Sequence, residues 1–208
     1  MSEALKRTFP EIAFVGEEAG GDRNAEKFWL MDPIDGTLHY SRGMPFCTSM
    51  LALIDRGEVV FSIIYDFLRD DMYWAERGQG AWRNESRLSV STRALKDGVM
   101  GWETMRHSDE DKVRDNALRS KTSLFKCVVA GWEYVMVAAG KLEGRVSFSP
   151  WGNDYDYAPG SLLVSEAGGV VANIGTTSYD YRNLNFIASN PVVYKELTTG
   201  EGAIFPFV

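Results

Sequence analysis

The chain has 208 residues, 45% of them hydrophobic and 25% charged, and a formal net charge of -7. Such a composition is typical of a globular protein, and the length suffices for a sizeable core in one domain or two closely packed layers. The negative charge disfavours nonspecific binding to nucleic acid or anionic lipid, although an anionic substrate is compatible with it if a cation lies between the two.

Targeting and redox signals are sparse. No apolar run approaches the roughly 18 residues of a membrane span, and no apolar signal segment follows Met1. Cys47 and Cys127 are too few for a disulfide framework and lack metal-ligand spacing, so we expect buried thiols. These features predict a cytoplasmic protein without membrane contact.

The first half of the chain predicts strands. Residues 11–18 and 27–32 are short apolar runs that end in acidic residues. Further strands are expected where β-branched and aromatic residues stand between turn residues. These are residues 59–68, 72–82 and 87–91, and they follow an apolar run at residues 46–55 that ends before a turn. Their succession indicates an antiparallel meander.

The second half predicts helices alternating with strands. Ser108 and the acids after it form a helix start, which predicts a helix over residues 108–125. Two more helices are expected, one closed by Gly140 or Gly144 and one with Pro159 in its first turn. They cover residues 130–144 and 158–169, and are followed by strands at 170–174 and 185–189 and a helix at 192–199. The pattern indicates layered sheets and helices.

Acidic residues follow several apolar runs, close to glycines: Glu17, Glu18, Asp32, Asp35 and Asp156, the last just before a predicted helix. Taken alone, Asp-Pro and Asp-Gly also suit a surface turn. Because the ends of neighbouring strands usually lie at one edge of a sheet, we expect Glu17, Asp32, Asp35 and Asp156 to converge, whereas Glu18 is expected to be solvated or to lie behind the ligands. Converging carboxylates repel one another unless a cation neutralises them. Oxygen ligands favour Mg²⁺, and the lack of a His or Cys cluster disfavours zinc.

Gly36 and Thr37 are expected to open a short helix over residues 37–42. Their N–H groups would then point toward the metals from the positive end of the helix dipole, an arrangement that suits phosphate. His39 is expected to be a helix-surface residue. Two-metal sites of this kind activate a water and stabilise the leaving oxygen of an in-line displacement.

Three motifs, GEE at 16–18, WLMDPIDGT at 29–37 and YDYAPGSLLVSEAGG at 155–169, resemble the inositol monophosphatase family of Mg²⁺-dependent, lithium-sensitive phosphatases. The resemblance extends over nearly the whole chain. It implies an α-β-α-β-α layered sandwich, often a homodimer. The chain would be a single unit over residues 1–208, with a metal and phosphate-motif sheet half at about 1–120 and a C-terminal α/β half at 121–208.

The resemblance also implies roles for single residues. Two or three Mg²⁺ ions would be held by Glu17, Asp32, Asp35, Asp156 and the main-chain carbonyl of Ile34. The catalytic residues would be Glu17, Asp35 and Thr37, whose hydroxyl orients the attacking water. The substrate would contact Asp35, Gly36, Thr37, Ala130 and Asp156.

Some positions depart from the family pattern. The family has some tens of helical residues before the glutamate motif, including an aspartate partner for the threonine, and this chain reaches that motif at Gly16. We therefore expect a member shortened at its N-terminus. Asp154 competes with Asp156 as a ligand, and the distance to the following motif favours Asp156. Ser149 stands near a position where many members place a substrate-binding glutamate.

The implied activity is hydrolysis of a small sugar or polyol phosphate, with myo-inositol monophosphate first because RGMPF follows the first aspartate motif. Sibling branches act on fructose 1,6-bisphosphate, 3′-phosphoadenosine 5′-phosphate or histidinol phosphate. A second hypothesis is a catalytically weak interaction protein, since some bacterial members act in RNA polymerase and antitermination complexes. The acidic charge and the lack of a basic stripe disfavour a nuclease, so no direct nucleic-acid partner is expected.

Overall fold

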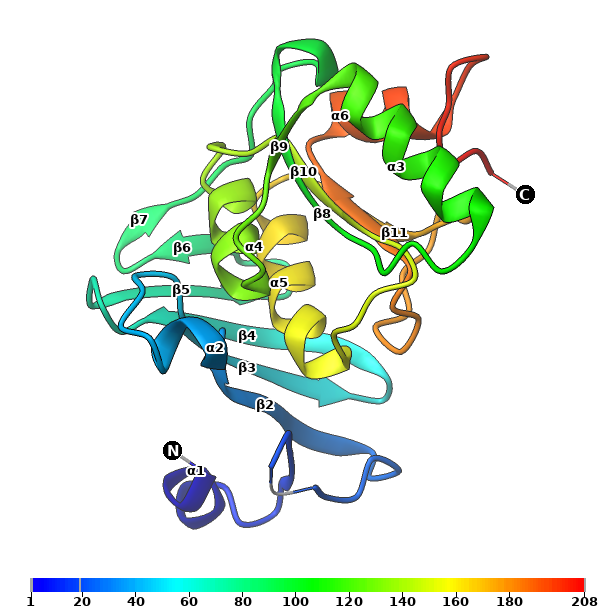
Figure 1. Ribbon diagram of the computed structural model, residues 1–208. Helices are drawn as coiled ribbons and strands as arrows, with labels where there is room; N and C mark the ends of the chain where they lie inside the picture. The colour runs from blue at the N-terminus through cyan, green and yellow to red at the C-terminus, as the bar shows by residue number, and fades with distance from the viewer. Residues whose placement is uncertain (1, 19, 208) are drawn as a thin grey trace.

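The computed structural model describes residues 2–18 and 20–207, which form two β-sheets with two helices packed between them (Figure 1). The first sheet has the strand order β1-β2-β3-β4-β5-β6-β7. Its strands are β1 (Ala13–Gly16), β2 (Lys27–Asp35), β3 (Thr48–Asp55), β4 (Glu58–Asp66), β5 (Asp71–Glu76), β6 (Gly80–Arg83) and β7 (Ser86–Arg87). The strands from β2 to β7 pair antiparallel, which confirms the predicted meander, and β1 is parallel to β2.

The strand predicted over residues 87–91 is mostly wrong, because only Ser86–Arg87 pairs with β6. The Leu88 N–H still donates to the Ala81 carbonyl of β6 at 2.8 Å, and after Leu88 the backbone leaves the sheet edge. The Val90 amide donates to the Ala167 carbonyl at 3.0 Å, and Leu88 and Val90 pack against the central core. Tertiary contact with the end of a helix therefore replaces strand pairing.

The second sheet has the order β11-β12-β10-β8-β9. Its strands are β8 (Val99–Glu103), β9 (Ser123–Phe125), β10 (Gly144–Ser147), β11 (Val170–Asn173) and β12 (Phe186–Ser189). The sequence predicted only β11 and β12 as strands. β10 contains a glycine and an arginine, which weaken the strand signal in the sequence. Glycine is nevertheless required at position 144, because a Cβ there would lie 2.5 Å from the Cβ of Ser189 on the neighbouring strand.

The helices are α1 (Ser2–Thr8), α2 (Thr37–Tyr40), α3 (Asp109–Lys121), α4 (Ala130–Ala138), α5 (Asp154–Glu166) and α6 (Pro191–Thr198), with a 3₁₀ turn at Leu95–Asp97. α3 ends at Lys121, so the helix predicted to residue 125 is wrong there. Thr122 is extended, its hydroxyl donates to the Gly98 carbonyl at 2.9 Å, and the next residues pair with β8 as β9. Helix α4 ends just before Gly140, whose φ of 65° is left-handed and stops the helix.

Helix α5 begins earlier than predicted. Its first residue is Asp154, so Asp156 lies inside the first turn and not before the helix. The reason is the capping box at Asn153, where the Asp156 carboxylate accepts from the Asn153 backbone N–H at 2.6 Å and the Asp156 N–H donates to the Asn153 carbonyl at 3.1 Å. Pro159 consequently lies within the helix and not in its first turn.

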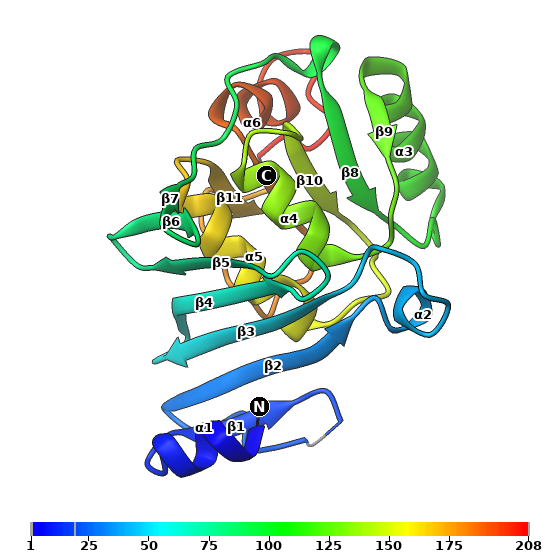
Figure 2. The ribbon, with the colours of Figure 1, turned by 90° about the vertical axis from the view of Figure 1, so that its left-hand side faces the viewer.

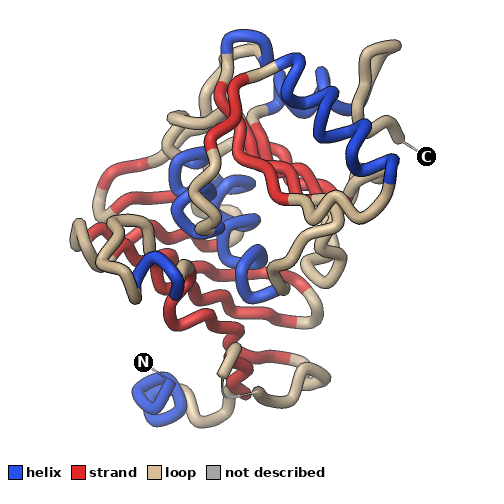
Figure 3. The backbone as a smooth tube through the Cα atoms, in the orientation of Figure 1, coloured by secondary structure: helices blue, strands red, loops and turns tan. Residues whose placement is uncertain are grey.

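The apolar faces of the helices and sheets determine how they stack in layers. Helices α4 and α5 fill the space between the sheets, α3 and α6 cover the outer face of the second sheet, and α1 lies on the outer face of the first (Figures 1 and 2). This order confirms the predicted α-β-α-β-α sandwich, and Figure 3 shows the alternation of helix and strand layers. No helix among residues 2–18 and 20–207 is both long and apolar enough to cross a bilayer.

The central core is aromatic where α4 meets α5. Tyr134 and Tyr157 are fully buried and both rings pack on Phe186, with centroids 6.3 Å and 5.2 Å away. Gly160 of α5 lies against the Tyr134 ring, and a Cβ added there would stand 2.0 Å from two ring atoms. Close approach of the two helices therefore requires glycine at this position.

We predict that Gly160→Ala destabilises the protein. Alanine improves helix propensity by about 1 kcal/mol, but overpacking a buried ring costs about 1–3 kcal/mol or more. The steric cost should dominate and lower the melting temperature, by about 2–4 °C for each kcal/mol in a chain of this size. Differential scanning calorimetry measures the change. Ser165→Ala, at an exposed site of the same helix, is the matched control and should be neutral; an unchanged or higher melting temperature in Gly160→Ala would contradict the packing described.

Candidate metal centre

The end of β2 carries two aspartates on one side of the strand. In a regular strand, residues three apart point to opposite faces. Here the register shifts: Asp32 faces Met50 and Asp35 faces Thr48, so β2 has one residue more than β3 between these pairs. The bulge contains Pro33, which has no N–H to donate to a ladder. It turns both carboxylates into the same buried pocket.

Asp35 is held from two elements. Its carboxylate accepts from the Thr48 hydroxyl at 3.1 Å and from the backbone N–H groups of Ala130 and Gly131 at 3.3 and 2.6 Å. The carboxylate thus lies at the N-terminus of α4, where free N–H groups and the helix dipole favour a negative charge. These bonds join the first sheet to α4 and orient Asp35.

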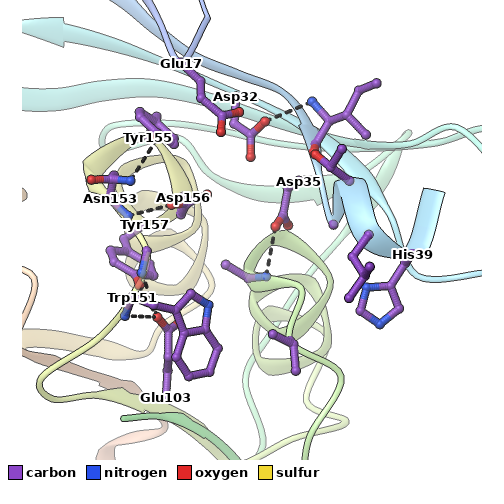
Figure 4. A pocket seen from close by; sticks show the side chains of 17 residues that line it. Glu17, Asp32, Asp35, His39, Glu103, Trp151, Asn153, Tyr155, Asp156 and Tyr157 are labelled. Carbon is purple, nitrogen blue, oxygen red and sulfur yellow. Dashed lines mark hydrogen bonds between the residues drawn. The ribbon is translucent and has the colours of Figure 1, made fainter. Parts of the chain in front are cut away.

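Asp156 approaches the same point from α5. One of its oxygens accepts from the Asn153 N–H at 2.6 Å within the capping box. One carboxylate oxygen from each of Asp32, Asp35 and Asp156 lies within 4.8 Å of the other two. Figure 4 shows the three side chains facing one another across the pocket. Asp154 is instead paired with Arg23, so of these two neighbouring acids only Asp156 joins the cluster.

Burial and like charge both act on this cluster. Burial, the larger cause, and the charges of neighbouring acids raise the pKa values of Asp32 and Asp156. The pKa of Asp35 rises to about 7, mainly through burial, despite the opposing hydrogen bond from Gly131. Three ionised carboxylates at this distance destabilise the fold. A hard divalent cation that prefers oxygen ligands fits the site, because it compensates this repulsion.

Glu17 lies at the mouth of the pocket. It is exposed, it follows β1, and it stands beside Asp32 (Figure 4). Its charge contributes to the raised pKa values of Asp32 and Asp156, although its carboxylate is not part of the close group of three. Glu18 is exposed and does not line the pocket.

The loop after β2 forms the opposite wall. The Thr37 hydroxyl donates to the Ile34 carbonyl at 2.9 Å, and Gly36 precedes α2 with a left-handed φ of 85°. A Cβ on Gly36 would lie 2.8 Å from the Val129 side chain and 2.9 Å from the Phe46 carbonyl, so only glycine fits. Ala130 also lines the pocket. The structure therefore brings all of the predicted site residues to one pocket.

The pocket has a volume of about 280 Å³, and much of its wall was not predicted. His39 lines it, where the sequence suggested a plain helix surface. Further wall residues that the sequence did not assign to the site are Leu38 of α2, Glu103 at the end of β8, Tyr155 and Tyr157 of α5, and Val128, Trp151, Gly152 and Asn153 from the loops before α4 and α5. Ser149 does not line the pocket, and its hydroxyl donates to Asp111 at 2.8 Å.

Glu103 orders the loop before α5. One of its carboxylate oxygens accepts from the backbone N–H groups of Trp151 and Gly152, both at 3.0 Å, and from the Tyr157 hydroxyl at 2.6 Å. The other oxygen pairs with the buried guanidinium of Arg145, which also pairs with Glu133 of α4. This network fixes the wall of the pocket next to Asp156.

Known proteins share this fold. The suhB extragenic suppressor protein of Bartonella henselae superposes with a TM-score of 0.83 at 28% identity, over 91% of this chain and 75% of that one. An IMPase of Thermotoga maritima gives a TM-score of 0.83 at 26% identity, over 94% and 76% of the two chains.

Curated relatives fall under two names. The chain is 34% identical over 175 residues to the Nus factor SuhB of Xylella fastidiosa, which covers 81% of this chain and 63% of that protein. It therefore spans less than two thirds of that relative's length. It is 30% identical over 203 residues to the inositol-1-monophosphatase of Mesorhizobium japonicum, covering 93% of this chain and 75% of that one.

The family assignment has support along nearly the whole sequence. The family model described as the inositol monophosphatase family matches residues 1–202 of the 208. The match includes both aspartate motifs and the segment that carries Glu17. The chain belongs to the inositol monophosphatase family.

Proposed function

We propose that this chain is a Mg²⁺-dependent phosphomonoesterase that hydrolyses a small sugar or polyol phosphate, with myo-inositol monophosphate as the first candidate substrate. The observation that carries the proposal is the convergence of three carboxylate oxygens within 4.8 Å beside the Gly36–Thr37 backbone. The 30% identity to a protein named inositol-1-monophosphatase supports the same activity.

The residues that would hold Mg²⁺ are Asp32, Asp35 and Asp156, with the Ile34 carbonyl and Glu17 at the mouth as further oxygen ligands. Two or three ions would share these ligands. When bound, the ions activate a water for attack on phosphorus and stabilise the departing alkoxide. Sensitivity to lithium and a homodimer remain predictions from the family resemblance.

Hydrogen bonds within the chain preorganise the pocket for substrate binding. Thr48 and the start of α4 hold the Asp35 carboxylate in one orientation, so little reorganisation is needed during the reaction. The backbone N–H groups of Gly36 and Thr37 would bind the phosphate oxygens, and the Thr37 hydroxyl and Glu17 would position the water. Asp35 and Asp156 would also bind hydroxyl groups of the leaving alcohol.

A second candidate function is an interaction factor with weak catalysis. The observation that favours it is the 34% identity to a protein named Nus factor SuhB. An assay of phosphate release from myo-inositol monophosphate distinguishes the phosphomonoesterase from the interaction factor. Metal binding without release under any condition would favour the interaction factor.

Asp35→Asn should lower Mg²⁺-dependent phosphate release by at least about 10²-fold, the scale seen when a preorganised charged or donor group is lost from an active site. The amide removes one negative charge from the cluster and binds Mg²⁺ weakly. Steady-state release from myo-inositol monophosphate, with Mg²⁺ and then with EDTA, measures the effect. Glu18→Gln makes the same chemical change at an exposed acid outside the pocket and should keep wild-type activity. Release at the wild-type rate in Asp35→Asn would rule out the proposed site.

Asp32→Asn should stabilise the metal-free protein at pH 8 while abolishing stabilisation by Mg²⁺. The pKa of Asp32 is raised in the fold, so the folded state binds a proton more tightly than the unfolded state. The stability of the metal-free wild type should therefore fall as the pH rises above 3.8, the ordinary value of this carboxyl. The side-chain amide of the Asp32→Asn variant does not ionise, so the variant does not lose stability in this way as the pH rises.

Thermal melts in EDTA and in Mg²⁺ between pH 5 and 9 test this prediction. We expect the melting temperature of the variant in EDTA at pH 8 to exceed that of wild type by about 2–4 °C or more, the equivalent of about 1 kcal/mol. The difference should shrink toward pH 5. A variant less stable than wild type in EDTA would show that Asp32 serves the fold as well as the metal.

A further inference from the structure

A second, smaller cavity adjoins the candidate active site. Its volume is about 50 Å³, and Trp151 lines both this cavity and the larger pocket. We call it the cationic cavity because three basic side chains line it. Its lining residues are Trp102, Thr104, Arg106, Asp115, Arg119, Leu124, Lys126 and Trp151.

The cationic cavity has more positive than negative charge. Its one carboxylate, Asp115, is buried and accepts from the Trp102 indole N–H at 2.7 Å. The same carboxylate pairs with Nε of Arg119 at 3.1 Å and with Nε of Arg106 at 3.3 Å. Lys126 is exposed and has no ion pair within the described part of the chain. Two positive charges are therefore left uncompensated, in a protein whose net charge is -7.

The two guanidinium groups are held in a way that leaves their ends available. Asp115 binds each of them through Nε, and their terminal amino groups donate no hydrogen bond to residues 2–18 or 20–207. A guanidinium with a free fork binds phosphate or carboxylate oxygens bidentately. Arg106 has a left-handed φ of 53°, uncommon outside glycine, and its N–H donates to the Thr104 hydroxyl at 3.0 Å. Its backbone is thus fixed at this place.

The topology places these cations at the same edge of the second sheet as Trp151, which also lines the candidate active site. Strands β9, β8 and β10 are parallel, so their carboxyl ends lie at one edge of the second sheet. Lys126 directly follows β9, Arg106 lies shortly after β8, and Trp151 follows β10 on the loop that leads to Asp156. Ligands of open α/β sheets bind outside such carboxyl ends. A leaving alcohol that extends from the aspartate cluster over Trp151 would reach the cationic cavity.

We propose that the cationic cavity binds a second anionic group, a phosphate or carboxylate, carried by the leaving alcohol of the substrate. Among the small sugar and polyol phosphates proposed above, esters with a second oxyanion are then preferred over myo-inositol monophosphate, and Arg106, Arg119 and Lys126 determine this specificity. The inference rests on the proposed phosphatase function and deepens it. A free anion has the same chemistry, and the test separates the two sources.

The kinetic test compares fructose 1-phosphate with fructose 1,6-bisphosphate in the presence of Mg²⁺. We expect wild type to have a KM about tenfold or more lower for the bisphosphate, and this ratio should fall with added salt because the contact is ionic. Lys126→Met and Arg106→Gln should each bring the ratio of the two KM values close to one. Lys141→Met, an exposed lysine that lines neither cavity, should keep the wild-type ratio.

The results of this test distinguish a failure of the proposed subsite from a failure of the proposed phosphatase function. Release from fructose 1-phosphate reports the phosphatase function itself, so equal KM values with normal release would overturn only the second-anion subsite. If neither ester is hydrolysed, calorimetric titration with inorganic phosphate in EDTA tests the cavity alone. Binding that disappears in the Lys126→Met and Arg106→Gln double variant would support an anion site; no binding by wild type would overturn it. Phosphate binding combined with equal KM values would show a site for a free anion and contradict a substrate subsite.

Discussion

Mutual repulsion of Asp32, Asp35 and Asp156 is the interaction on which the rest of the structure depends. Carboxylates this close and this buried are unfavourable without a cation, and each needs a separate structural device to hold it. The bulge at Pro33 directs two of them into one pocket, and the capping box of α5 holds the third. Active sites commonly keep such locally destabilising groups because function requires them.

A buried charge network holds the helices that meet this cluster. Arg145 of β10 pairs with Glu103 of β8 and Glu133 of α4, and the faces of Tyr134 and Tyr157 lie 5.2 and 5.3 Å from its guanidinium carbon. An unpaired charge at this depth would be strongly unfavourable, so the network defines one arrangement of the strands and helices. Through Glu103 the same network also shapes the loop at Trp151, which lines both the candidate active site and the cationic cavity.

Strands were predicted from the sequence where neighbouring residues carry the signal, and were missed where contacts with distant residues determine the structure. The meander was predictable because its strands are bounded by turn residues and rich in β-branched side chains. Strands β8 and β10 were missed, since Gly101, Gly144 and Arg145 are poor strand formers that serve tertiary contacts. A Cβ on Gly101 would stand 2.7 Å from a carboxylate oxygen of Glu133, a contact no local pattern reveals. Likewise the strand β9 was read as helix because its pairing with β8 is nonlocal.

By itself, the sequence determined the chemical character of the site: oxygen ligands without a His or Cys cluster, aspartates beside Pro and Gly, and a family motif that names the candidate residues. Only the tertiary structure decided that Asp154 pairs with Arg23, and that Glu17 stands at the mouth of the cluster and not within it. The tertiary structure also decided that Val128 and Trp151 line the pocket, and that basic side chains gather in the neighbouring cationic cavity. The physical reason is that these groups follow different strands, and their meeting depends on parallel pairing and helix packing between distant parts of the chain.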